Sequence, residues 1–143
     1  MNPSRMQEAR EVLARIEEWV GSTGTAVVEG PCWRLSPADA AASPLWVCGE
    51  GAWDLTVGFG RASARMELGY TDKITTAEQL DDLEDICRSV IEGRLVEKRR
   101  GRRGSAWRLT LTSGKMTHGT ANWPPVPWMR TVEQEFRPYQ AVS

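Results

Sequence analysis

Residues 53–68 read Trp-Asp-Leu-Thr-Val-Gly-Phe-Gly-Arg-Ala-Ser-Ala-Arg-Met-Glu-Leu and carry the strongest β-strand signal in the chain. Apolar and polar residues alternate from Trp53 to Phe59 and again from Ala62 to Leu68. Such alternation places the apolar side chains on one face of a strand. A glycine-containing stretch separates the two runs, so we predict a hairpin. One apolar face and one polar face are typical of an antiparallel sheet that is covered on one side.

The segment that follows, residues 75–93, has the periodicity of an amphipathic helix. Thr75 and Glu78 match a capping box, and Gly93 matches a helix stop. The apolar stripe consists of Leu80, Leu83, Ile86, Cys87, Val90 and Ile91. The candidate partner-binding residues are the acids on the opposite face, namely Glu78, Asp81, Asp82 and Asp85. An acidic helix face can meet a basic protein surface, and it is also typical of an ordinary solvated face.

The rest of the chain contains one more predicted helix and several short predicted strands. Residues 3–20 predict an amphipathic helix, because apolar residues recur at three- and four-residue steps. Strands are predicted at residues 25–29, 32–35, 45–48, 94–98, 105–112 and 115–120. The order predicts an α+β fold, with a mainly antiparallel sheet and with an N-terminal helix and one central helix packed on one face.

Length and composition are those of one globular domain spanning residues 1–143. The apolar fraction of 41% and charged fraction of 26% exclude wholesale disorder. No apolar run approaches the roughly 18 residues of a membrane span. The N-terminal residues lack the apolar core of a signal peptide, so we expect a cytoplasmic protein. The C-terminal tail, residues 121–143, contains prolines and two tryptophans that could dock it on the body, and residues 131–136 predict a helical turn.

Cysteine and histidine counts limit the chemistry. The chain has Cys32, Cys48, Cys87 and one histidine, His118. An odd number of cysteines without a signal peptide argues against a disulfide framework, and no C-x-x-C pair suggests zinc. One histidine excludes metal motifs that need two. We therefore expect no metal and no cofactor. Without a local nucleophile signature, we also expect no enzymatic activity.

A basic run, Lys98 to Arg103, supports a competing interpretation. It is predicted to form an exposed hairpin loop, in which the charges could contact a nucleic-acid backbone beside a stacking tryptophan. The residues concerned are Lys98, Arg99, Arg100, Arg102, Arg103 and Trp107. The loop could equally serve solubility alone. The alternative function is therefore a nucleic-acid-associated regulatory protein.

Charge is distributed unequally along the chain. Residues 1–97 contain nine basic and 17 acidic residues, a balance of −8, whereas residues 98–143 contain nine and two, a balance of +7. If the two parts form separate surfaces, the resulting field would steer charged partners. If they interleave in one sheet, the asymmetry cancels in space.

Three segments carry a resemblance to a known class of proteins. They are residues 50–70, which begin Glu-Gly-Ala-Trp-Asp, residues 75–83, Thr-Thr-Ala-Glu-Gln-Leu-Asp-Asp-Leu, and residues 107–115, Trp-Arg-Leu-Thr-Leu-Thr-Ser-Gly-Lys. Over about residues 50–120 the chain resembles small bacterial immunity proteins of toxin–immunity loci. The resemblance implies a non-enzymatic α+β protein that occludes the active site of a partner toxin. A further interpretation is a homo-oligomer built through tryptophan-rich edges.

Overall fold

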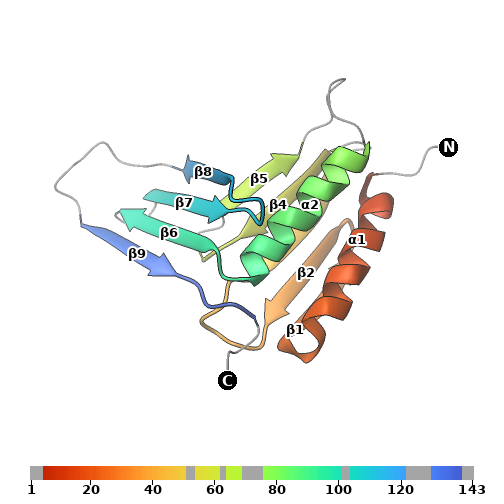
Figure 1. Cartoon of the computed structure of the whole chain (residues 1–143), viewed down its shortest axis with the longest axis horizontal. Coiled ribbons are helices and arrows are strands. Elements are labelled where there is room, and N and C mark those ends of the chain that lie inside the picture. The colour runs from red at the N-terminus through yellow and green to blue at the C-terminus, as the bar shows by residue number, and fades with distance from the viewer. Residues whose placement is uncertain are drawn as a thin grey trace.

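The computed structural model describes residues 5–50, 54–61, 64–68, 76–100, 104–121 and 130–139. These residues form two long helices, one short 3-10 helix and nine strands (Figure 1). The elements are α1 (Arg5–Val20), η1 (Gly21–Thr23), β1 (Gly24–Glu29), β2 (Cys32–Pro37), β3 (Leu45–Glu50), β4 (Asp54–Phe59), β5 (Ala64–Leu68), α2 (Thr76–Ile91), β6 (Leu95–Arg100), β7 (Gly104–Thr110), β8 (Met116–Ala121) and β9 (Thr131–Glu135).

The strands form two antiparallel sheets, which confirms the α+β fold class. One sheet has five strands in the order β1-β2-β3-β4-β5, and the other has four in the order β8-β7-β6-β9. Both helices lie on the same side of the five-stranded sheet, and the four-stranded sheet lies beside α2 (Figure 1). None of the described helices is both long and apolar enough to cross a membrane.

The apolar face of the five-stranded sheet follows the predicted alternation. The expected polar face of β4 is not solvated, because Thr56 and Gly58 are also buried and the Trp46 ring lies against Gly58. The pairing of β4 with β5 confirms the hairpin, although Trp53, Ala62 and Ser63 lie outside the described residues. One cross-strand row, Trp33–Val47–Val57–Met66, faces the helices. Trp33, Val47 and Val57 are each at most 2% exposed, so this row belongs to the core. The apolar face of the sheet therefore packs against the buried side of α1, where Ala9, Leu13 and Ile16 are also buried.

The apolar stripe and the C-terminal end of helix α2 are predicted correctly. Leu83, Cys87 and Val90 are fully buried. Thr75, of the predicted capping box, lies outside the described residues. Gly93 ends the helix with φ +75°, a conformation that favours glycine. A Cβ there would lie 2.8 Å from the Phe136 carbonyl oxygen and 2.7 Å from the Pro138 nitrogen, so glycine also allows the C-terminal segment to approach.

The C-terminal segment differs from prediction. Residues 131–136 were expected to form a helical turn, which is wrong, because Thr131–Glu135 pairs with β6 as strand β9. The free edge of β6 offers hydrogen bonds that a single helical turn cannot match. Beyond β9 the Tyr139 amide donates to the Ile91 carbonyl at 2.8 Å, and its hydroxyl donates to the Ser43 carbonyl at 2.6 Å. Residues 130–139 are thus docked, whereas residues 122–129, with Trp123 and Trp128, lie outside the described residues.

A buried polar cluster joins the β4–β5 turn to the four-stranded sheet. Glu97 of β6 is only 1% exposed, and one of its carboxylate oxygens accepts a hydrogen bond from the Arg61 amide at 3.2 Å. A Cβ on Gly60, which has φ +78°, would lie 2.3 Å from the other oxygen. The Gly60 amide donates to the Ser43 hydroxyl at 2.8 Å. Because its carboxylate and hydroxyl groups are engaged with neighbouring backbone, we assign this cluster a structural role.

Candidate functional site

The four predicted acids lie on α2, at the spacing that places them on one side of the helix. Glu78, Asp81 and Asp82 are exposed, and Asp85 is half-buried. The intervening apolar residues Leu83, Ile86 and Cys87 face the core. The structure therefore presents an acidic ridge, which we define as Glu78, Asp81, Asp82 and Asp85.

Asp85 differs from the other acids of the ridge because it is committed to contacts within the chain. One of its carboxylate oxygens accepts hydrogen bonds from the Thr112 amide at 3.0 Å and from the Thr112 hydroxyl at 2.5 Å. The Ser89 hydroxyl also lies 3.3 Å from this oxygen. Asp85 thus holds the β7–β8 turn against α2. Of the three exposed acids of the ridge, Asp81 and Asp82 also line hollows and are therefore the best placed to meet a partner.

A shallow acidic hollow of about 320 Å³ opens on one side of α2. Its lining consists of Asp81, Glu84, Asp85, Arg88 and Thr112. Glu84 lies 3.5 Å from both the Arg15 and the Arg88 guanidinium groups; the pair with Arg15 connects α1 to α2, and the pair with Arg88 lies within α2. Three carboxylates line the hollow, and the Arg15 and Arg88 guanidinium groups both lie against one of them, Glu84. The hollow therefore keeps a net negative charge, which favours a cationic group from a partner.

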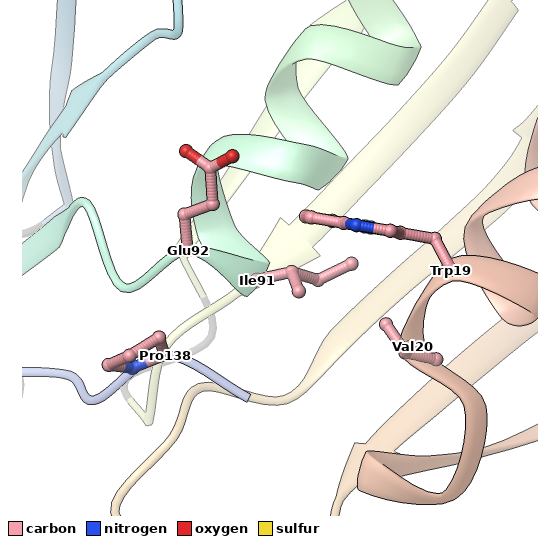
Figure 2. A pocket seen from close by; sticks show the side chains of 5 residues that line it. All are labelled: Trp19, Val20, Ile91, Glu92 and Pro138. Carbon is pink, nitrogen blue, oxygen red and sulfur yellow. The ribbon is translucent and has the colours of Figure 1, made fainter. Parts of the chain in front are cut away.

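Arg88 connects the acidic hollow to a smaller apolar one at the C-terminal end of α2. Its guanidinium carbon lies 4.9 Å from the centre of the Trp19 ring, a cation–π contact. Trp19 of α1, Ile91 of α2 and Pro138 of the C-terminal segment come together around the small hollow, with Glu92 at its margin (Figure 2). Its volume is about 50 Å³. It could therefore admit the tip of an alkyl side chain.

A third hollow, of about 140 Å³, lies on the other side of the acidic ridge. It is mainly apolar and is lined by Met66, Leu68, Asp82, Ile86, Leu111, Lys115 and Thr117. The exposed Asp82 therefore lines an apolar groove that β5, α2 and the β7–β8 region form together. This groove was not predicted from the sequence. Its signal was weak, because Met66, Leu68 and Leu111 are indistinguishable in sequence from ordinary core residues.

The basic residues are arranged differently from the prediction. Lys98 lies in strand β6, as the predicted strand at residues 94–98 has it, but Arg99 and Arg100 also belong to β6 instead of a loop. Arg102 and Arg103 lie outside the described residues. Strand alternation sends Arg99 towards Glu97, whose carboxylate lies 3.9 Å away. Lys98 and Arg100 share the opposite face of the sheet with Arg108 of β7. On that face Lys98 pairs with Glu133 at 3.9 Å, and Arg100 donates to the Thr131 hydroxyl at 3.2 Å.

Trp107 is not the stacking platform that the sequence suggested. It lies on the inner face of β7, is only 8% exposed, and meets the Phe59 ring edge-on with the ring centres 5.0 Å apart. A base could not stack on a ring that the core already covers. The expectation of a tryptophan available to nucleic acid at this position is therefore wrong, and Trp107 is a contact between the two sheets.

The cysteine interpretation also needs correction. Cys32 and Cys48 are directly opposite each other in β2 and β3 and form a disulfide. The odd number of cysteines did not exclude a disulfide, because the third cysteine, Cys87, is a buried free thiol. The disulfide counts against the expected cytoplasmic location, since disulfides are rare where thiols are kept reduced. Burial, with a smaller contribution from the Glu84 charge, raises the pKa of Cys87 to about 12, so this thiol is not an activated nucleophile.

The described residues contain no group of three or more histidine, cysteine or acidic side chains arranged to hold a metal ion. Comparison of the chain with protein-family models, with curated proteins and with solved structures found no match.

Proposed function

We propose that this protein binds another protein through the acidic ridge and acts as an immunity- or inhibitor-type protein that neutralises a toxin. The observation that carries the proposal is the position of Asp81 and Asp82, which are exposed and each line a hollow beside α2. Charged groups beside apolar grooves are typical of protein interfaces, in which apolar contacts provide affinity and charges steer association.

The chemistry of this surface defines the partner. A cationic side chain would find carboxylates in the acidic hollow, and an apolar side chain would find Leu68 and Leu111 in the neighbouring groove. Arg88 and Trp19, already in contact, are residue types enriched among interface hot spots. A toxin that acts on nucleic acid presents a basic cleft, and an acidic ridge is complementary to such a cleft.

The test compares two charge-reversal variants. Asp81→Lys/Asp82→Lys changes the ridge, and Glu11→Lys/Glu18→Lys makes the same change in charge at exposed positions of α1. The tagged proteins would capture partners from native lysate with nuclease present, and a captured partner would then be expressed with and without this protein to measure growth inhibition. We expect the ridge variant alone to lose both capture and protection. Equal behaviour of the two variants, or a captured partner that is not toxic, would contradict the proposal.

A second candidate function, contact with a nucleic-acid backbone, is favoured by one observation: Lys98, Arg100 and Arg108 share a sheet face. Phosphate contacts of this kind make binding steeply salt-dependent. Arg100→Ala/Arg108→Ala should then weaken binding of a single-stranded oligonucleotide, whereas Arg34→Ala/Arg65→Ala on the other sheet should not. Salt-independent binding, or equal loss in both variants, would reject this candidate.

A further inference from the structure

Strand β1 forms an open edge of the five-stranded sheet. All six of its residues pair with β2 without a bulge, and no described strand pairs with its other side. Val27 is 47% exposed and Val28 is 55% exposed. Because neighbouring residues of a strand point to opposite faces, apolar surface is exposed on both faces of this edge.

Two of the other three described edge strands, β5 and β9, carry charged residues along their length, whereas β1 has its single charge at its end. Strand β5 carries Arg65 and Glu67 and also contacts β7 and β8. Strand β9 carries Glu133 and Glu135. Strand β8 itself has no acidic residue, lysine, arginine or proline, but it contacts β5 and Lys115 directly precedes it. Charged residues are a usual protection against edge-to-edge association. From Gly24 to Val28, β1 has neither a charged residue nor a proline.

We propose that β1 pairs antiparallel with β1 of a second copy of this chain. A twofold axis perpendicular to the sheet at Val27 would place Val27 opposite Val27 of the other copy and Val28 opposite Ala26. The faces of the two sheets then remain continuous, because directly opposite residues in an antiparallel pair share a face. Five strands from each copy would form one sheet across the dimer.

Charge favours a second copy as the occupant of this edge. Glu29 is the only charged residue of β1, and in this register it lies opposite Thr25 of the other copy. The two glutamates therefore stand at opposite ends of the paired strands, where they do not oppose each other. A twofold contact is also self-limiting, since it uses the β1 edge of both copies and leaves no further β1 edge for a third copy.

The dimer would leave the acidic ridge of each copy accessible. Helix α1 contacts β1, whereas α2 contacts α1 on one side and β7 on the other. The ridge is therefore separated from the proposed interface by α1 (Figure 1). Two ridges on one assembly would allow bivalent binding where a partner presents two sites. The pairing itself does not depend on the proposed function.

Sedimentation analysis of the full chain over a range of concentrations tests the pairing. Val27→Lys/Val28→Lys places charge on the β1 edge. Val132→Lys/Met116→Lys makes the same change at two comparably exposed positions, 53% and 61%, on the edges of the other sheet. We expect a dimer for the unmodified chain and the control variant and a monomer for the β1 variant. Circular dichroism and thermal melting would establish that both variants are folded.

Hydrogen exchange provides a second measurement that does not require a variant. Protection of the β1 amides should increase with protein concentration, whereas protection of the β9 amides should not. A monomer at every soluble concentration would overturn the proposal. It would equally be overturned by a dimer that the β1 variant retains, or by β1 amides that become protected only when a different protein is added.

Discussion

The two sheets are assembled in different ways. In the five-stranded sheet every strand pairs with its neighbour in the chain, and the Cys32–Cys48 disulfide links two adjacent strands. In the four-stranded sheet β9 pairs with β6, although β7 and β8 lie between these two strands in the sequence. The first sheet is therefore held together by pairing between sequence neighbours and by a covalent bond. The second sheet depends on the docking of β9, a segment distant in sequence from β6. Closing the longer loop between these strands costs more chain entropy.

Removal of the Tyr139 side chain should have the largest effect, because it anchors the returning segment. Tyr139 is 2% exposed, and truncation of a buried aromatic costs about 3–5 kcal/mol. Tyr139→Ala should lower the free energy of unfolding by about that amount and expose the β6 and β9 amides to hydrogen exchange before those of β2 and β3. Tyr139→Phe, which loses only the bond to Ser43, should cost about 1–2 kcal/mol. Equal exposure of both sheets in Tyr139→Ala would show that they unfold as one unit.

Loss of the disulfide should be next in size and should act on the other sheet. The two cysteines are 16 residues apart in sequence, and cross-linking a loop of that size contributes about 3 kcal/mol through the entropy of the unfolded chain. Cys32→Ser/Cys48→Ser should show this loss in urea unfolding, with exchange increased in β1, β2 and β3. The unmodified chain in a reducing agent serves as the control and should match the variant. Identical stability with and without reducing agent would contradict the prediction.

Alkaline pH should weaken the core that both sheets share. Burial raises the pKa of Cys87 from 9.0 to about 12, and burial together with the Cys87 charge also raises the pKa of Tyr139. The unfolded thiol ionises first, so its contribution to stability is complete below pH 9 and is lost as pH rises from there towards 12. Urea unfolding over this range should show stability falling, with a flatter profile in Cys87→Ala. An unchanged profile in that variant would remove Cys87 from the explanation.

The smallest effect is expected at the β6–β9 pairing itself. Lys98 and Glu133 are 3.9 Å apart, and their side chains are 43% and 49% exposed. An exposed ion pair contributes about 0.2–1 kcal/mol and is screened by salt. Glu133→Gln should therefore lower stability slightly at low ionic strength and not at all at high ionic strength. A loss that persists in high salt would show that Glu133 does more than pair with Lys98.

The candidate site was predictable in part. Periodicity alone places Asp81 and Asp82 on the exposed side of α2, because a helix with a buried stripe must turn the other residues outward. It could not show that Thr112, 27 residues beyond Asp85, donates to that carboxylate. Nor could it show that β5 and the β7–β8 turn complete a groove beside Asp82. Both features depend on contacts between elements that are distant in sequence.

Periodicity in the sequence was sufficient to predict the two long helices and the hairpin of the neighbouring strands β4 and β5. Those elements are specified locally, since a repeat of 3.6 or of two residues has one arrangement that buries its apolar side. Tertiary structure decided the division into two sheets, the strand conformation of residues 131–135, the burial of Trp107 and the pairing of Cys32 with Cys48. In each case the partner group comes from another element. A residue's neighbours in sequence cannot specify which distant backbone or ring will satisfy its hydrogen bonds and cover its apolar surface.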